Sequence, residues 1–263
     1  MTGRGDHGLP IQKPVISVVI GTRSRKDIYE RFVKSVIDNA SVFTEIVVGD
    51  ATQENRYAHD FVTSNVATGA WVCVRVNHES PPLGMLRGYN QCFRRCNGEW
   101  VAWFNEDCEL LPGWDVAAMS FMRQNETVGL GAVYFSDRDE DGSYGPFRVY
   151  SYPFSAPHAN FGFIRRDLGE KIGWFDERLG WGYGSDSAFG LQVIAYGKAV
   201  TRIPGCKCIH HRAWDNEMNQ NHVLHRMNDL RMFKQLWPFA KTYEMSLKHL
   251  EQYANLLGPE TIA

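Results

Sequence analysis

The first half of the chain alternates short apolar runs with stretches of helical periodicity. Apolar residues fall on one helical face over 28–39, and a second helical stretch spans about 83–96. The apolar runs are rich in β-branched residues, as in strands buried on both faces, and predict strands over 15–21, 45–49, 71–76 and 100–104. This βαβαβαβ rhythm predicts an α/β, Rossmann-like fold with a mostly parallel central sheet flanked by helices.

The second half of the chain has a different pattern. A helix is predicted over 188–196, a longer one from Asn219 to Trp237, and a last one over 239–257. An acidic turn, 137–142, is expected to join two strands in a hairpin. The strands predicted in this half are 129–135, 145–150 and 160–165.

Composition narrows the classes of protein to which the chain can belong. Its 263 residues, 44% of them hydrophobic, can bury one sizeable core. A net charge of −2 gives no reason to expect nucleic acid or an anionic membrane as a partner. No apolar run approaches the length of a membrane span, so we expect a soluble cytoplasmic protein. The oligomeric state is left open.

The cysteines do not form the pattern of a disulfide scaffold. Six in a chain of this length are expected to remain thiols in a reducing compartment. Cys206-x-Cys208 followed by His210 and His211 is compatible with zinc, but the second cysteine pair of a structural zinc site is missing. Zinc is therefore the weaker interpretation of these residues.

Polar clusters follow three of the predicted strands. They occupy 21–25, 50–52 and 105–109. Parallel sheets bind ligands beyond the carboxyl ends of their strands, so we expect a site at this edge. The last cluster, Asn105-Glu106-Asp107-Cys108-Glu109, supplies oxygen ligands that suit Mg²⁺ or Mn²⁺ carrying a diphosphate. His210, after a later strand, can complete such a shell, with a structural histidine as the plain alternative.

Other residues near these strand ends are candidates for binding a nucleotide. Arg23, Arg25 and Arg87 can pair with phosphate, and surface solvation or a nearby carboxylate is the alternative for each. Asp50 can accept hydrogen bonds from a base or ribose, or it can simply form a turn.

An aromatic and glycine-rich loop precedes the helix predicted over 188–196. Trp181 and Tyr183, separated by a glycine, are expected to offer flat faces to a ligand, and Gly184 completes the loop. Asp186 follows at the start of the helical pattern, where a helix N-terminus favours its ionised form. It is either a helix N-cap or a catalytic acid or base.

Two groups of motifs carry a resemblance to a known family. VISVVIGTRSR, EIVVGDAT, the segment 86–90 and WVAWFNEDCELLPGW resemble the nucleotide-binding half of inverting GT-A glycosyltransferases of the family-2 type. The segment 175–219 resembles the acceptor half of β-1,4-galactosyltransferases and polypeptide N-acetylgalactosaminyltransferases. The resemblance covers about Val15 to Trp237. It implies a GT-A fold and transfer of a hexose or N-acetylhexosamine from a nucleotide sugar to an acceptor hydroxyl with inversion, assisted by Mn²⁺ or Mg²⁺.

The resemblance also implies roles for individual residues. Asp186 matches the general base, while Asp107 and His210 match the metal ligands. Residues matching the donor and acceptor contacts are Gly21, Thr22, Arg23, Asp50, Arg87, Asn105, Glu106, Trp181, Tyr183 and Gly184. UDP-Gal, UDP-GalNAc or UDP-Glc is the implied donor, and a carbohydrate or another hydroxyl compound the acceptor.

The resemblance and the helical pattern after Asn219 together predict a division of the chain into three parts. A flexible N-terminus (1–14) precedes a GT-A domain (15–222), and C-terminal helices (223–263) follow it. Within the domain, 15–112 is the nucleotide-sugar-binding half and 113–222 the acceptor and catalytic half.

The chain departs from the family pattern at several positions. The acid pair is Asn105-x-Asp107 in one register and Asp107-x-Glu109 in the other, so Asp107 alone is supported by both. The acids that usually accompany the base are replaced by Ser185 and Ala188. A non-catalytic nucleotide-sugar or carbohydrate-binding module, and a sugar-1-phosphate nucleotidyltransferase, therefore stand as alternatives to a glycosyltransferase.

Overall fold

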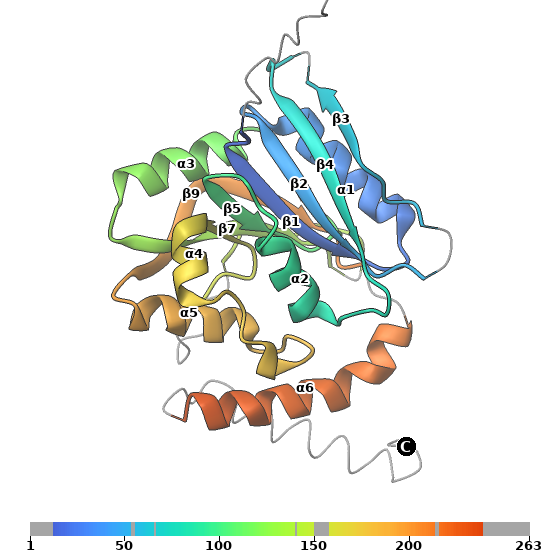
Figure 1. The fold of residues 1–263 in the computed structure, drawn as a ribbon, viewed down its shortest axis with the longest axis vertical. Coiled ribbons are helices and arrows are strands. Elements are labelled where there is room, and N and C mark those ends of the chain that lie inside the picture. Colours follow the sequence, from blue (N-terminus) through green and yellow to red (C-terminus); the bar gives the residue numbers. More distant parts are fainter. Residues whose placement is uncertain are drawn as a thin grey trace, which may run out of the picture.

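A computed structural model of the protein describes residues 13–53, 56–65, 67–139, 141–149, 158–213 and 216–238. Its nine-stranded mixed sheet has the order β3-β4-β2-β1-β5-β8-β7-β9-β6 (Figure 1). The strands are β1 (Ile16–Thr22), β2 (Thr44–Asp50), β3 (Phe61–Ser64), β4 (Trp71–His78), β5 (Trp100–Trp103), β6 (Cys108–Leu110), β7 (Val128–Asp137), β8 (Gly162–Arg165) and β9 (Ala199–His210). The helices are α1 (Lys26–Asn39), α2 (Met85–Phe93), α3 (Trp114–Gln124), α4 (Arg166–Ile172), the 3₁₀ turn η1 (Glu177–Leu179), α5 (Ser185–Ala195) and α6 (Asn216–Leu236).

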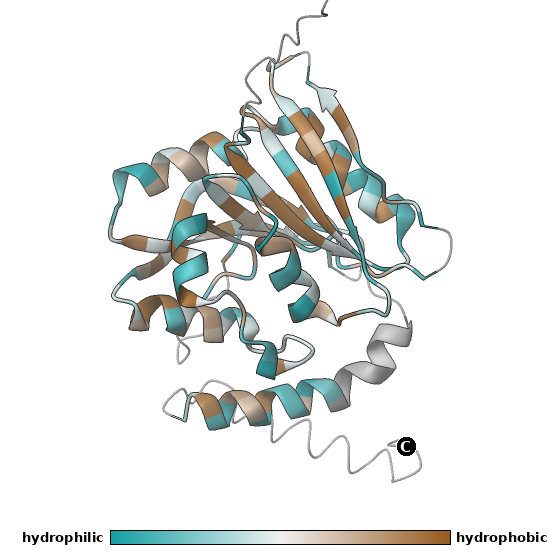
Figure 2. Ribbon diagram, in the orientation of Figure 1, coloured by the Kyte–Doolittle hydropathy of each residue, from teal (hydrophilic) through white to brown (hydrophobic). Residues whose placement is uncertain are grey.

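Helices cover both faces of the sheet, as predicted. Val18 and Ile20 of β1 pack in the same core cluster as Phe32 of α1 and Trp114 of α3. Val19 points the other way and belongs to a second cluster, which includes residues of α2, α4 and α5. Both faces of β1 and β2 are buried, which explains why their sequences are continuous apolar runs. Figure 2 shows these hydrophobic positions concentrated on the central strands.

The strands β4, β2, β1 and β5 are parallel, which confirms the prediction for the first half of the chain. The strict βαβαβαβ rhythm is wrong at one place, because the described residues between β2 and β4 contain no helix. They contain β3, an edge strand antiparallel to β4. Antiparallel pairs also join β5 to β8, β8 to β7 and β9 to β6, so the second half of the sheet is mixed.

Other predicted elements are found with changed bounds. The strand expected over 145–150 is reduced, within its described residues, to isolated bridges of Tyr144 and Arg148 with residues 138 and 135. The long helix starts earlier than predicted, at Asn216, so the predicted boundary at 222/223 falls inside α6. The helix predicted over 239–257 lies outside the described residues. None of the helices in the described ranges is long and apolar enough to cross a membrane.

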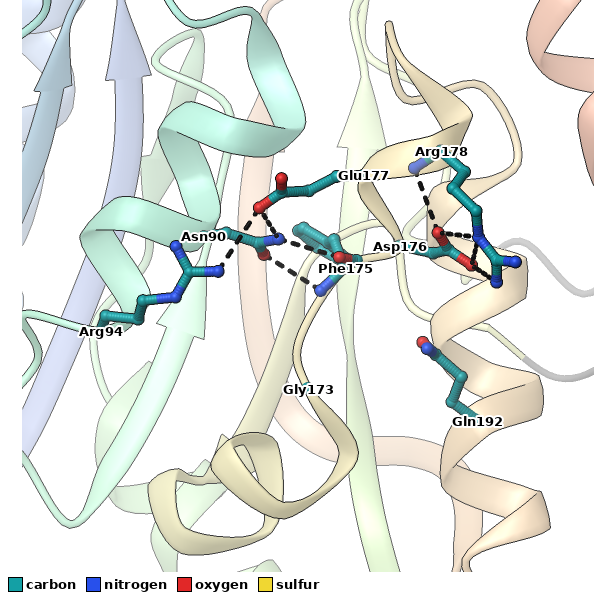
Figure 3. A pocket seen from close by; sticks show the side chains of 8 residues that line it. All are labelled: Asn90, Arg94, Gly173, Phe175, Asp176, Glu177, Arg178 and Gln192. Carbon is teal, nitrogen blue, oxygen red and sulfur yellow. Dashed lines mark hydrogen bonds and ion pairs between the residues drawn. The ribbon is translucent and has the colours of Figure 1, made fainter.

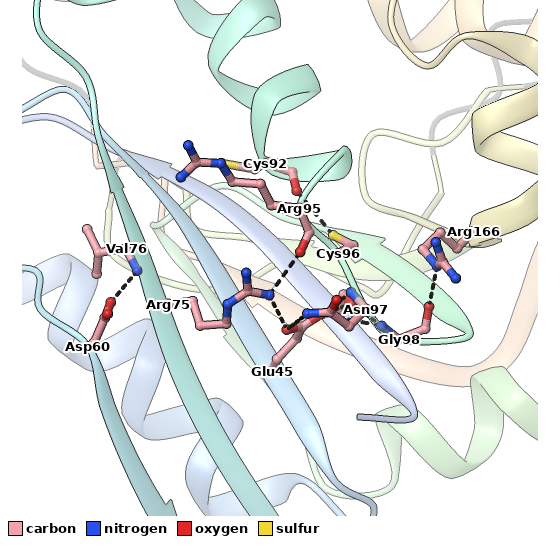
Figure 4. Close-up of polar contacts among 11 residues, drawn as sticks. Glu45, Asp60, Arg75, Val76, Cys92, Arg95, Cys96, Asn97, Gly98 and Arg166 are labelled. Atoms are coloured by element: carbon pink, nitrogen blue, oxygen red, sulfur yellow. Dashed lines mark hydrogen bonds and ion pairs between the residues drawn. The ribbon is translucent and has the colours of Figure 1, made fainter. Parts of the chain in front are cut away.

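A buried carboxylate fixes the sheet at the edge opposite the polar strand ends. Glu45 of β2 accepts hydrogen bonds from the Ser17 hydroxyl at 2.5 Å, from Arg75 at 2.9 Å and from the backbone amides of Asn97 and Gly98 (Figure 4). These contacts tie the turn between α2 and β5 to strands β1, β2 and β4. The parallel strands are thereby held in register, with their carboxyl ends aligned at the other edge.

Candidate active site

Three side chains stand side by side where the parallel strands end. Thr22 of β1 is in register with Asp50 of β2, and Asp50 with His78 of β4. The Thr22 hydroxyl lies 2.6 Å from the Tyr57 hydroxyl. Asp50 is completely buried; its Oδ1 accepts from the Thr52 amide at 2.9 Å and its Oδ2 lies 2.7 Å from His78 Nδ1. The predicted residues Gly21, Thr22 and Asp50 do meet at this edge, but the Asp50 carboxylate is buried and contacts the partly exposed His78.

The loop after β5 brings a second set of predicted residues to the same edge. Glu106 is buried and forms an ion pair with Arg25, Nε to Oε1, at 2.6 Å. Burial raises the pKa of Glu106, although Arg25 and Thr22 act against this effect. Arg25 also donates to the carbonyl of Ala213, so it links the loop after β1 to the segment after β9. Asn105 is exposed beside this pair.

Asp107 and His210 meet, as their predicted shared role requires. His210 Nε2 lies 3.4 Å from Asp107 Oδ1, while Asp107 Oδ2 accepts from the Ala213 amide at 3.0 Å. The other ring nitrogen, Nδ1, lies 2.6 Å from Oδ1 of Asp137, a buried residue at the end of β7. One ring nitrogen of His210 is thus held by a carboxylate, and the other faces a second carboxylate. Histidines that bind metals are oriented in this way.

The charges of this trio reinforce one another. Burial alone lowers the pKa of His210, but the nearby carboxylates of Asp107 and Asp137 outweigh burial and raise it. Burial acts to raise the pKa of Asp107, and His210 with Arg25 outweighs it, so the pKa of that carboxyl is lowered. Asp137 also has a lowered pKa because Arg148, His210 and Arg212 outweigh its burial. The two carboxylates are therefore anionic at neutral pH.

These residues fit a hard divalent cation. Asp107 Oδ1 is buried and accepts no hydrogen bond from the described residues, and the same holds for Glu106 Oε2. A carboxylate with an imidazole suits Mn²⁺, or Mg²⁺ with more oxygen ligands. In the described part of the chain, no three His, Cys, Asp or Glu side chains gather closely enough to hold a metal by themselves. Remaining coordination positions would then belong to phosphate oxygens or water.

The neighbouring residues Glu109 and His211 form a separate chain of contacts. His211 Nε2 lies 3.1 Å from Glu109 Oε2, and its Nδ1 lies 2.7 Å from the Tyr144 hydroxyl. Cys206 and Cys208 are buried in the apolar core, and burial raises the pKa of the Cys206 thiol. All six cysteines are free thiols. The arrangement favours His210 over His211 as the partner of Asp107.

Asp186 lies in the first turn of α5 and is not its N-cap. That position is taken by Gly184, whose φ of +80° is a conformation glycine adopts readily. The Asp186 side chain is partly exposed, accepts from the Ser187 amide at 2.8 Å and lies 3.8 Å from Nε2 of buried His158. The N-cap alternative for Asp186 is therefore wrong.

A short segment links Asp186 to the Asp107 and His210 pair. His158 contacts Asp186, and three residues later Phe161 packs its ring 5.3 Å from the His210 ring. An extended stretch of this length spans about 10 Å. The carboxylate of Asp186 and the imidazole of His210 thus flank one segment of the chain, 158–161, at the same edge of the sheet.

The aromatic-glycine loop is held by α6. Trp181 is 45% exposed, and one of its faces stacks on His225 with ring centroids 3.9 Å apart. The Tyr183 ring lies under Arg226, and its amide donates to Asp229 at 3.0 Å. Only part of the predicted aromatic surface is therefore open to a ligand. Burial raises the pKa of Asp229 to about 6.

Arg87 is not grouped with the other predicted residues. It is exposed on α2, where its Nε lies 3.7 Å from Glu177. Glu177 also lines a polar surface pocket of about 350 Å³ between α2, the 173–178 loop and α5 (Figure 3). In this pocket Asn90 binds the backbone of Phe175 through both its amide nitrogen and its oxygen. Arg23 is exposed after β1, close in sequence to Thr22.

Sequence reasoning missed four residues that complete this site. Asp137 and Asp229 carry the contacts with His210 and Tyr183, and His78 and His158 contact Asp50 and Asp186. His78 lies two residues beyond the strand predicted over 71–76, and this position is an available signal. The sequence pattern predicts Asp137 only as the start of a turn, and nothing local distinguishes Asp229 or His158.

The chain matches a known family and several known structures. The match to glycosyl transferase family 2 covers residues 17–189. An uncharacterised protein from Mycobacterium tuberculosis (strain CDC 1551 / Oshkosh) is 29% identical over 128 residues, which are 49% of this chain and 38% of that protein. The matched region therefore spans little more than a third of that relative.

Solved structures share the fold at low sequence identity. A mannosyltransferase from Pyrobaculum calidifontis in complex with GDP-Man and Mn²⁺ is 16% identical, with a TM-score of 0.56 over 96% of this chain and 73% of that chain. S. aureus TarS 1–349 in complex with UDP-GlcNAc is 12% identical, with a TM-score of 0.59 over 89% and 75%. The predicted GT-A fold is confirmed. Since the family match extends from β1 to the first turns of α5, well over half of the chain, this protein belongs to glycosyl transferase family 2.

Proposed function

We propose that the protein is an inverting glycosyltransferase that moves a sugar from a nucleoside diphosphate to an acceptor hydroxyl. The observation that carries this proposal is the grouping of Asp107, His210 and Asp137 at the strand edge, with Asp186 on the other side of segment 158–161. Asp107, His210 and Asp137 together have the chemistry to hold a metal-bound diphosphate. Asp186 offers a partly exposed carboxylate at a helix N-terminus.

Asp107 and His210 would hold the cation, with Asp137 fixing the imidazole. Mn²⁺ or Mg²⁺, when bound, supplies charge that stabilises the departing diphosphate. Arg25 lies near this charge, but its ion pair with Glu106 means that it acts mainly by ordering the loop. The Mn²⁺ in the mannosyltransferase complex supports the choice of ion.

Asp186 would act as the general base. It takes the proton of the acceptor hydroxyl while that oxygen forms the new bond to the anomeric carbon. The bond from that carbon to the diphosphate oxygen breaks on the opposite face, so the anomeric configuration inverts. Trp181 and Tyr183, held by α6, would border the acceptor sugar through their exposed parts.

The donor is proposed to be a UDP-sugar carrying a hexose or N-acetylhexosamine. The resemblance of segment 175–219 to galactose and N-acetylgalactosamine enzymes supports UDP-Gal, UDP-GalNAc or UDP-Glc, and the UDP-GlcNAc complex of TarS supports the nucleotide. The acceptor is a carbohydrate or another hydroxyl compound. A cytoplasmic location stays a prediction.

A thermal-shift panel of nucleotide sugars, with Mn²⁺ or with EDTA, tests the binding part of this proposal. A ligand that binds only the folded state raises the melting temperature by mass action. We expect UDP-sugars to raise it with Mn²⁺ and to lose most of that effect with EDTA. The absence of any shift across the panel would contradict the proposal.

A further inference from the structure

The carboxylate of Asp50 is inaccessible to any ligand, although it stands at the predicted nucleotide edge. It is 0% exposed, and both of its oxygens are engaged. The side chain that continues from it toward the surface is His78, which is 35% exposed. A nucleotide lying over these strand ends would therefore meet the imidazole and not the carboxylate.

The contacts of Asp50 fix the tautomer of His78. The Thr52 backbone amide can only donate, and it occupies Oδ1 at 2.9 Å. Oδ2 lies 2.7 Å from His78 Nδ1 and, as a carboxylate oxygen, can only accept. Nδ1 therefore carries the proton, and Nε2 of the neutral ring is left as an acceptor. No hydrogen bond from the described residues occupies that Nε2.

We propose that His78 Nε2 reads the nucleobase of the donor by accepting a hydrogen bond from its ring N–H. This inference rests on the proposed function, whose donor site it makes more specific. Uracil and guanine both present a ring N–H beside a carbonyl group, whereas cytosine and adenine present a bare ring nitrogen at the corresponding position. A hydrogen-bond acceptor on the protein therefore pairs with uracil and guanine. It faces another acceptor, which is unfavourable, in cytosine and adenine.

His78 lies in the right place for this role. It is the last residue of β4 and is in register with Asp50 of β2, which is in register with Thr22 of β1. Strands β4, β2 and β1 are neighbours in the sheet (Figure 1). The Asp107 and His210 pair lies beyond β5, on the far side of β1. A nucleoside diphosphate with its phosphates near Asp107 can extend its base across β1 and β2 to His78.

The substitution Asp50→Asn should reverse the preference of His78. The Thr52 amide still requires an acceptor, so the asparagine oxygen must face Thr52 and its NH₂ group must face His78 Nδ1. Nδ1 then has to accept, the ring proton moves to Nε2, and Nε2 becomes a donor. A donor at that position pairs with the bare ring nitrogen of cytosine and opposes the N–H of uracil.

The test is to measure Kd by calorimetry for UDP, GDP, CDP and ADP with Mn²⁺, under one set of conditions for every variant. For the unaltered protein, UDP or GDP should bind about tenfold more tightly than CDP and ADP, the size expected of one hydrogen bond gained or opposed. Asp50→Asn should bring the ratio of CDP to UDP affinity to one or above. His78→Ala should abolish discrimination while retaining nucleotide binding.

If both His78→Ala and Asp50→Asn bind nucleoside diphosphates with the same base preference as the unaltered protein, the proposed role of His78 is wrong. The proposed function would still stand in that case. Failure of every nucleotide to bind the unaltered protein would overturn both. Thermal unfolding of each variant shows that it is folded, and His59→Ala, an exposed histidine whose Nδ1 contacts only a backbone carbonyl, is the matched control.

Discussion

At the scale of single residues, the site depends on buried carboxylates that position histidines. Asp137 holds His210 toward Asp107, and Asp50 holds His78 toward the surface. In each case the acid is almost completely buried and the histidine partly exposed. The ligand would contact the histidine, while the acid determines which ring nitrogen is free to act.

Asp137→Asn should weaken Mn²⁺ binding by about tenfold or more, the usual effect of removing an orienting partner. The amide no longer fixes the imidazole by charge, and it leaves Arg148 and Arg212 without their shared carboxylate near the cation. Electron paramagnetic resonance of free and bound Mn²⁺, in the presence of UDP, measures the change. Asp141→Asn, an exposed acid in the following turn, is the control and should bind Mn²⁺ as the unaltered protein does. Equal affinity in both variants would contradict the role of Asp137.

At the scale of elements, α6 and the aromatic-glycine loop form one unit. Asp229 accepts a hydrogen bond from the backbone amide of Tyr183, and the ring of Trp181 stacks on that of His225. Gly182 has a φ of +98°, and a Cβ atom there would come within 2.0 Å of Met85 Cε, so the loop also packs tightly against the start of α2. The aromatic-glycine loop is thus held by helices from both halves of the chain.

The raised pKa of Asp229 predicts a pH-dependent stability. Its carboxyl has a pKa of about 6 in the folded protein and 3.8 ordinarily, so the folded state holds a proton that the unfolded chain has released between these values. The stability that this group contributes is therefore complete below about pH 4 and is lost as the pH rises through about 6.

Urea unfolding between about pH 4 and pH 7 tests this prediction. The free energy of unfolding of the unaltered protein, minus that of Asp229→Asn, should fall by about 2 kcal/mol over the range. The same difference for Asp176→Asn should stay flat, because Arg178 lowers the pKa of Asp176 and moves its transition below this range. A flat difference for Asp229→Asn would show that this carboxyl is not shifted by burial.

The turn between α2 and β5 should depend on Glu45. Replacing it by alanine removes the acceptor for the Ser17 hydroxyl and for the amides of Asn97 and Gly98. We expect the free energy of unfolding to fall by about 3 kcal/mol, because buried donors left unpaired are costly. Glu99→Ala, a half-exposed acid in the same region whose ion pairs are 3.9 Å long, should change it by less than about 0.5 kcal/mol. Urea denaturation measures the free energy of unfolding of both variants. Equal effects of the two substitutions would contradict the role of Glu45.

At the scale of the whole molecule, the parallel half of the sheet could be predicted because its signals are local. Buried strands read as apolar runs, and amphipathic helices show their period. Strand β3 is not predicted from the sequence, because it lies at an exposed edge of the sheet and has no continuous apolar run. Its residue Val62, for example, is 67% exposed. The contact of Asp137 with His210 joins residues 73 positions apart, which no local pattern reports. The strand-end clusters, the start of the helical pattern and the resemblance together pointed to Asp107, His210 and Asp186, but not to the residues that position them.

The central claim is that this site transfers a sugar and that Asp186 is its base. The direct test measures nucleoside diphosphate release from UDP-sugars with Mn²⁺, over a range of hydroxyl acceptors, for the unaltered protein and for Asp186→Asn. We predict release by the unaltered protein and a rate at least about a hundredfold lower in the variant, with nucleotide affinity nearly unchanged. Asp167→Asn, an exposed acid on α4, is the matched control and should release nucleotide at the normal rate. Undiminished release by Asp186→Asn would contradict the assignment of the base, and binding without release under every acceptor would favour a non-catalytic module.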